Sequence, residues 1–150
     1  MKRNLLITLA VIIFLSIALF GFKTFITSIY NQRGCEFANI DNIEVNVGID
    51  IPSIERTSCN YDEIKNQKSV YFKLDKKVNV QDYCKSNTFK ILQTSDFNKF
   101  KNLDFVGNNH LFKDKTKNYY FKSENTRSNS YNAVLNAETK ELWIVISFKN

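Results

Sequence analysis

Residues 142–148, LWIVISF, form the stretch that decides the fold of this 150-residue chain. The even-numbered positions from Leu142 to Phe148 are all apolar, and Trp143 and Val145 between them are apolar as well. Successive side chains of a strand point to opposite faces, so the even-numbered residues share one face and Trp143 and Val145 share the other. Apolar residues on both faces indicate a strand that is covered on both sides. We therefore expect residues 142–148 to form a central strand of a sheet.

Working outward from this strand, two more strands precede it with short loops between them. They are predicted at residues 118–123, NYYFKS, and 131–135, separated by a polar loop at 124–128 and followed by a turn at 136–141. Short connections join antiparallel neighbours, so the C-terminal third is predicted to be an antiparallel meander.

The middle of the chain adds further elements. Residues 69–74, SVYFKL, and 43–51, IEVNVGIDI, alternate with a period of two and are predicted as strands, with a turn-like break at 65–68. Residues 53–61 are either a strand that carries Cys59 or irregular chain.

One helix is predicted in this region. Asn79 is a typical N-cap residue with Asp82 in the first turn, so a short helix is expected at about 79–87, with Val80, Tyr83 and Cys84 on one face.

The chain between this helix and the meander is the hardest to interpret. Residues 93–116 are expected to be irregular, with a turn at 107–109 and aromatic side chains packed under the sheet. The fold class is therefore α+β, with an antiparallel sheet of about five strands and one short helix after an N-terminal transmembrane helix.

Residues 5–22, LLITLAVIIFLSIALFGF, include fifteen apolar residues out of eighteen and carry no charge. As a helix they would be roughly 27 Å long, close to the thickness of a bilayer's hydrocarbon core. A small-residue site at 16–18, SIA, also fits a cleaved signal peptide, and the longer apolar run favours an uncleaved anchor. We expect an anchor or signal segment at 1–22, a stalk at 23–42 and a domain at 43–150.

The charges beside this segment predict its orientation. Lys2 and Arg3 lie directly before it, so the positive-inside rule places the N-terminus in the cytoplasm. The expected location is the bacterial inner membrane, crossed once, with the C-terminal domain in the periplasm.

The three cysteines are Cys35, Cys59 and Cys84. A disulfide is expected outside the cytoplasm, and the pair we favour is Cys59–Cys84, which would close a loop of about 25 residues worth roughly 3 kcal/mol. Cys35–Cys59 is the alternative. No CxxC motif or histidine cluster accompanies the cysteines, so we expect no zinc site.

Charge is unevenly distributed along the domain. Residues 36–64 hold seven acids and one base, whereas residues 65–122 hold thirteen lysines and five acids. This pattern fits two solvated faces, or a basic face for anionic lipid, nucleic acid or an acidic partner. Basic and aromatic residues interleave at 70–73, 97–101 and 117–122, but alternation along strands accounts for that, and the export segment argues against nucleic acid.

Catalytic signals are weak. His110 is the only histidine, and the neighbouring carboxylates Asp62 and Glu63 lie on an acidic stretch that is expected to face solvent. The sequence contains no glycine-rich phosphate loop, no GxSxG and no HExxH. We expect no enzyme activity, no cofactor and no small-molecule substrate.

Several short segments resemble those of small exported, envelope-associated proteins of Gram-negative bacteria, some of immunity-protein type. The resemblance covers about residues 55–148, and the last turn followed by Leu-Trp is its most similar part. It rests on residues 71–75, 82–83, 87–89, 119–121 and 133–143. It implies an anchored or lipidated periplasmic domain that binds a protein, and it assigns no functional residues.

The leading hypothesis is a membrane-anchored periplasmic domain that binds a protein, most concretely an immunity protein that neutralises a delivered toxin by covering its active site. The acidic stretch 36–64 would face a basic toxin, or the lysine-rich stretch 65–122 an acidic one. The alternative is a structural or accessory subunit of a cell-envelope complex that uses its transmembrane helix for assembly.

Overall fold

The structure of the chain is a computed structural model that describes residues 2–36, 39–93, 96–100, 103, 105 and 118–149. It divides into two compact units, residues 1–32 and residues 33–150. The first unit is a single helix and the second is an α+β domain, as expected from the sequence.

Helix α1 extends over Lys2–Asn31 without a break, so helical structure continues well past Phe22. Its segment Ile7–Asn31 has a mean hydropathy of 2.4 and is long and apolar enough to cross a membrane. The hydroxyl groups of Ser16, Thr24 and Thr27 each donate to the carbonyl oxygen four residues earlier, at 2.8–2.9 Å. Each of the three hydroxyl protons therefore has an acceptor within the helix. A helix that crosses lipid needs such bonds, because lipid offers no other acceptor.

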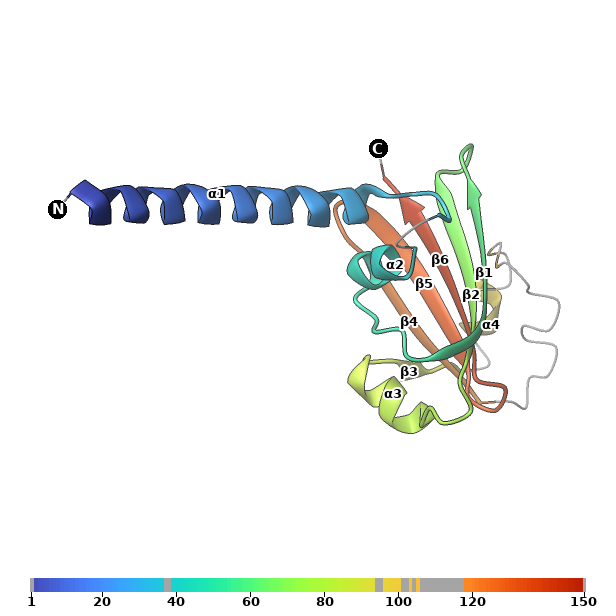
Figure 1. Ribbon diagram of the computed structural model, residues 1–150. Helices are drawn as coiled ribbons and strands as arrows, with labels where there is room; N and C mark the ends of the chain where they lie inside the picture. The colour runs from blue at the N-terminus through green and yellow to red at the C-terminus, as the bar shows by residue number, and fades with distance from the viewer. Residues whose placement is uncertain are drawn as a thin grey trace. The chain divides into compact units, whose positions relative to one another are not determined.

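The domain is built on one antiparallel sheet of six strands, in the order β1-β2-β6-β5-β4-β3 (Figure 1). The predicted α+β class is confirmed. The strand count, predicted at about five, is corrected to six among the described residues, and the single short helix predicted for the domain is corrected to more than one. The strands are β1 (Ile54–Asp62), β2 (Gln67–Leu74), β3 (Lys90–Ile91), β4 (Tyr119–Asn125), β5 (Asn129–Asn136) and β6 (Glu141–Phe148).

Strand β6 is central and is covered on both faces, as its sequence predicted. Leu142, Ile144 and Ile146 belong to one buried apolar cluster, whereas Trp143 and Val145 belong to a second cluster across the sheet. Because β6 pairs with β2 on one side and β5 on the other, it joins the two halves of the sheet.

The predicted strand at 43–51 is wrong, because this stretch holds helix α2 (Asn39–Val47). Ile43 and Val47, four residues apart, are fully buried, whereas Val45 between them is half exposed. Gly48 ends the helix: it adopts a left-handed φ of 57°, and its N–H donates to the carbonyl of Glu44 at 2.8 Å. A glycine in this conformation is a common helix terminator. The residues before it therefore form a helix, although their apolar residues alternate as in a strand.

Helix α3 (Val80–Ser86) confirms the short helix that was predicted at about 79–87. The Oδ1 atom of Asn79 accepts hydrogen bonds from the backbone N–H groups of Gln81 and Asp82 at 3.1 and 3.4 Å, as an N-cap should. Helices α2 and α3 pack on the same face of the sheet, over the first cluster (Figure 1).

The opposite face carries the second cluster, which includes Phe97 and Phe100 of helix α4 (Phe97–Phe100) together with Phe105. These residues confirm that aromatic side chains from the region 93–116 pack under the sheet. The turn predicted at 107–109 lies outside the described residues.

Candidate protein-binding edge

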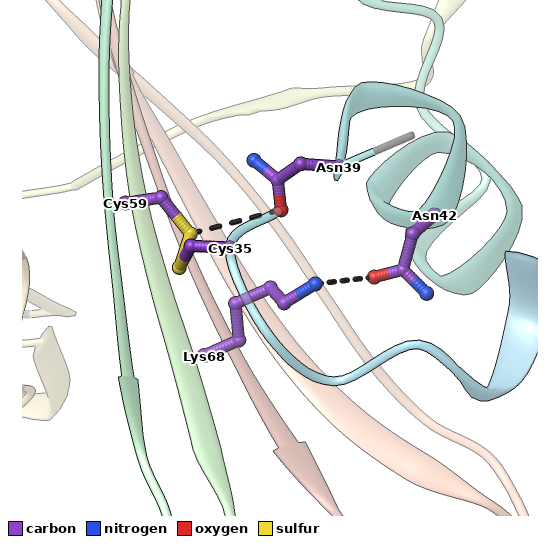
Figure 2. The surroundings of a disulfide bond; sticks show 5 residues. All are labelled: Cys35, Asn39, Asn42, Cys59 and Lys68. Atoms are coloured by element: carbon purple, nitrogen blue, oxygen red, sulfur yellow. Dashed lines mark hydrogen bonds between the residues drawn. A yellow bond between two sulfur atoms is a disulfide. The ribbon is translucent and has the colours of Figure 1, made fainter. Parts of the chain in front are cut away.

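The disulfide joins Cys35 to Cys59, with their Cα atoms 5.7 Å apart (Figure 2). The favoured pairing of Cys59 with Cys84 is therefore corrected to the alternative one. Cys35 lies in residues 32–36, the connector that follows α1, and Cys59 lies on β1. The bond thus fastens the connector to an edge strand of the sheet.

Cys84 is the free cysteine, and its position on α3 explains why it does not pair with Cys59. Its side chain is directed into the first cluster and is only 3% exposed. Burial raises the pKa of this thiol to about 11, so it is inert near neutral pH. The structure thus uses Cys84 as a small apolar core residue.

A network of buried polar side chains lies between α2 and the sheet (Figure 2 shows its first bond). The Nζ atom of Lys68 on β2 donates to Oδ1 of Asn42 at 2.6 Å. Asn46 donates to the carbonyl of Asn42 at 2.9 Å, and Asn129 on β5 donates to Oδ1 of Asn46 at 2.8 Å. These bonds fix α2 against two strands of the sheet, β2 and β5.

A second set of contacts holds the start of the connector. Arg33 donates to Oδ1 of Asn66 at 2.7 Å, and its guanidinium carbon lies 5.3 Å from the centre of the Phe148 ring. Asn66 also donates to the carbonyl of Phe148 at 3.0 Å and accepts from the hydroxyl of Tyr61 at 2.8 Å. The connector is therefore bonded to the domain from Arg33 onward.

Strand β1 forms one edge of the sheet and is the longest strand, with nine residues. Its residues from Glu55 to Ser58 are all exposed, and no described strand pairs with its outer side. The outer side of an edge strand offers backbone donors and acceptors to another chain. This edge is the candidate site.

A hollow of about 660 Å³ lies beside the same edge. Its walls come from the disulfide, the connector, the first turn of α2 and the middle of β1, and it is lined by Cys35, Glu36, Asn39, Ile40, Asp41, Thr57, Ser58 and Cys59. The Sγ atom of Cys59 is 3.6 Å from Oδ1 of Asn39 (Figure 2). The hollow is thus built around the disulfide. Of the two cysteine pairings considered from the sequence, only Cys35–Cys59 places a disulfide here.

The charged residues around this hollow are mostly acidic. Glu36 and Asp41 line it, and Glu55 lies two residues before Thr57 on β1, with Arg56 as the neighbouring base. All four side chains are exposed. The acidic stretch recognised in the sequence therefore gathers in part at one edge of the sheet.

The other edge of the sheet is less open. Strand β3 pairs with only two residues of β4, and a hollow of about 350 Å³ lined by Thr88, Lys90, Phe121, Lys122, Ser123 and Glu124 lies beside it. The Nζ atom of Lys122 on β4 donates to the carbonyl of Gly48 at 2.8 Å, so a side chain that lines this hollow is already bonded to the end of α2. We therefore regard β1 as the better candidate.

The other residues singled out in the sequence lie elsewhere. Asp62 accepts from the backbone N–H of Lys65 at 3.0 Å, and this bond lowers the pKa of its carboxyl group. Phe72 and Tyr119, from the segments where basic and aromatic residues interleave, are buried in the two clusters. His110 lies outside the described residues.

Metal binding finds no support in the described part of the chain, where no group of three or more His, Cys, Asp or Glu side chains could hold an ion. The chain matches no protein-family model, no curated protein and no solved structure.

Proposed function

We propose that this protein is anchored in a bacterial inner membrane by α1 and uses its periplasmic domain to bind another protein. The most concrete form of the proposal is an immunity protein that neutralises a delivered toxin. The observation that carries it is the open edge of β1 beside an acidic hollow. An extended segment of a partner can add to such an edge through main-chain hydrogen bonds, while side chains in the hollow give specificity.

The charges around the hollow define the partner's chemistry. Glu36, Asp41 and Glu55 favour a basic segment, because opposite charges steer association and like charges oppose it. Binding would cover the surface of a basic toxin around its active site. Inhibition by occlusion requires no catalytic residue in this chain.

Two features support the compartment. A stable disulfide such as Cys35–Cys59 is typical of proteins outside the cytoplasm. The positive charges of Lys2 and Arg3 before the apolar segment favour a cytoplasmic N-terminus. Both support a domain on the outer side of this membrane, where toxins delivered by neighbouring cells would arrive.

Site-specific photo-crosslinking in intact cells tests the binding edge. A photoreactive residue at Ser58 of the full chain should capture a protein partner, whereas one at Glu138, an exposed residue on the β5–β6 turn, should not. Equal capture at both positions would contradict β1 as the binding edge. If the captured protein is a toxin, expressing this chain should protect cells from it.

Charge reversal tests the chemistry of the partner. Replacing Glu36, Asp41 and Glu55 together by lysine should lower crosslinking at Ser58 at least tenfold. The matched control reverses three exposed acids elsewhere in the domain, Asp50, Asp82 and Glu138. A control variant that loses as much crosslinking as the first would show that total charge, and not this edge, determines binding.

A second candidate function is favoured by the polar side of α1. Lys23, Thr24, Thr27, Ser28 and Asn31 line one shallow hollow along its last turns together with Phe20. Small and polar residues on one side of a membrane helix favour packing against another helix. This supports a subunit of an envelope complex, and a stable membrane assembly captured by a photoreactive residue at Thr27, with no toxin captured at Ser58, would favour it.

A further inference from the structure

The turn between β1 and β2, residues 63–66, presents an apolar side chain to solvent. Ile64 is 98% exposed, the highest value among the exposed large hydrophobic residues of the described chain. Two hydrogen bonds close the turn: the Lys65 N–H donates to Oδ1 of Asp62 at 3.0 Å, and the Asn66 N–H donates to the carbonyl of Glu63 at 3.3 Å. A single exposed isoleucine is normal on a protein surface, and Ile64 is distinguished by its position in the fold.

This turn is linked to the end of α1 by very little chain. Helix α1 ends at Asn31, and Arg33 is already bonded to Asn66, the last residue of the turn. Two residues of extended chain span at most about 7 Å between Cα atoms. The disulfide at Cys35 makes the attachment covalent two residues later. Whatever the orientation of the domain, the turn therefore stays within a short reach of the last residue of α1.

The length of α1 places that last residue in the membrane surface if the helix spans a bilayer. The segment Ile7–Asn31 has 25 residues and would be about 37 Å long, which exceeds the roughly 30 Å of the hydrocarbon core. Its end therefore lies in the headgroup layer, and the short link keeps the turn near the same layer.

We infer that the β1–β2 turn is a second membrane contact, in which the side chain of Ile64 enters the interfacial layer of the bilayer. The inference rests on the proposed anchoring by α1. The turn has no net positive charge to attract anionic headgroups, because Lys65, 3.6 Å from Asp62, is outnumbered by Asp62 and Glu63. The contact is therefore apolar, and it forms on zwitterionic lipid as well as on anionic lipid.

The contact would orient the domain. Strand β6 runs from Glu141 to Phe148, and Phe148 donates its N–H to the carbonyl of Asn66 in the turn. The β5–β6 turn, residues 137–140, lies at the opposite end of the same strand. A turn held at the bilayer would direct this opposite end, with Glu138, away from the membrane.

An environment-sensitive fluorophore tests the contact in the full chain, reconstituted into phosphatidylcholine vesicles. The label is attached to cysteine in Ile64→Cys, Glu138→Cys or Leu19→Cys, each in a Cys84→Ala background with the disulfide intact. The label at position 64 should show blue-shifted emission and be quenched at least threefold by nitroxide-bearing lipids. The label at position 138 should behave as in water.

The three positions separate the possible failures. If position 19 is quenched and position 64 behaves like position 138, the anchor stands and the inferred contact is wrong. If position 19 is not quenched, anchoring by α1 fails and the contact fails with it. Repeating the measurement with anionic vesicles should leave the signal at position 64 within about 20% of its value, and a strong increase would contradict an apolar contact.

Discussion

Lys68 and Asn42 form a 2.6 Å hydrogen bond beneath helix α2, where the lysine side chain is fully buried. Its ammonium group is thus removed from water, which is costly for a charge. Burial lowers the pKa of Lys68 from 10.5 to about 8, so the group is still charged at neutral pH.

This pKa predicts that the domain becomes more stable as the pH rises above 8. The unfolded chain keeps the lysine proton up to about pH 10.5, whereas the folded chain releases it from about pH 8. The unfolded state therefore binds more protons in this window, and the free energy of unfolding should rise by about 1 kcal/mol between pH 8 and 9. Denaturant titrations of the full chain in detergent, followed by the fluorescence of its single tryptophan, measure the change.

The variant Lys68→Met should lack this rise, whereas Lys90→Met, which removes an exposed lysine, should keep it. The range is limited to pH 9 because the buried Cys84 thiol acts in the opposite direction. Burial raises its pKa from 9.0 to about 11, so the opposing effect grows as the pH approaches and passes 9. An equal rise in the Lys68→Met variant would show that another group titrates.

The disulfide should stabilise the domain by about 3 kcal/mol, because it joins two cysteines 24 residues apart and so lowers the conformational entropy of the unfolded chain. The double variant Cys35→Ser/Cys59→Ser should lose this stability and become insensitive to reductant. The Cys84→Ala variant should stay sensitive to reductant. If reductant leaves the wild-type denaturation midpoint unchanged, the disulfide does not contribute.

Thiol counting should distinguish the three cysteines. A membrane-impermeant maleimide should label no cysteine in the native chain, because Cys84 is buried and the other two are paired. It should label one after unfolding in denaturant, and three after unfolding with reductant. Mass spectrometry gives the count, and a labelled peptide containing Cys59 in the unreduced sample would contradict the Cys35–Cys59 bond.

The end of α2 should depend on Gly48. A Cβ atom there would meet no atom within 4 Å, but the φ of 57° is unfavourable for any side chain. Gly48→Ala should therefore destabilise the domain by about 1 kcal/mol through the backbone alone.

Gly34→Ala is the matched control, since it also has open space around it and no left-handed φ. Its denaturation midpoint should stay close to that of the wild type. Similar losses in the two variants would mean that the conformation of Gly48 is not responsible.

The capping side chain of Asn79 gives a last prediction. Asn79→Ala should cost about 1 kcal/mol because the N–H groups of Gln81 and Asp82 lose their acceptor, whereas Asn79→Asp should keep the cap and the stability. Loss of stability in both variants would assign the amide group of Asn79 another role.

The parts of the fold with strong local signals could be predicted from the sequence. Strand β6 has apolar residues on both faces, and α3 begins at an N-cap residue. In both elements a few neighbouring residues are enough to indicate the secondary structure. Residues 43–51 misled the prediction because alternating apolar residues fit a strand. In the structure a buried polar face, Asn42 and Asn46, shares the helix with Ile43 and Val47, and a period of apolar residues cannot reveal buried asparagines.

The candidate site depended on long-range contacts that the sequence does not show. The acidic character of residues 36–64 was visible, but its relation to an open edge was not, because strand order is set by pairing between distant segments. The cysteine pair could not be predicted for the same reason. Cys84 shares a helix face with Val80 and Tyr83, and this apolar face packs into the core, where Cys84 has no partner cysteine.

The position of β6 in the sheet has a consequence for how this chain is made. A growing chain can form the β1–β2 hairpin and the β4–β5 hairpin early, but each then displays an open edge until residues 141–148 are available. Open edges of this kind invite pairing with other chains. Residues 141–148 close both of these edges, so a chain cut short before Glu141 would be left as two unjoined hairpins, exposed to proteases and to aggregation.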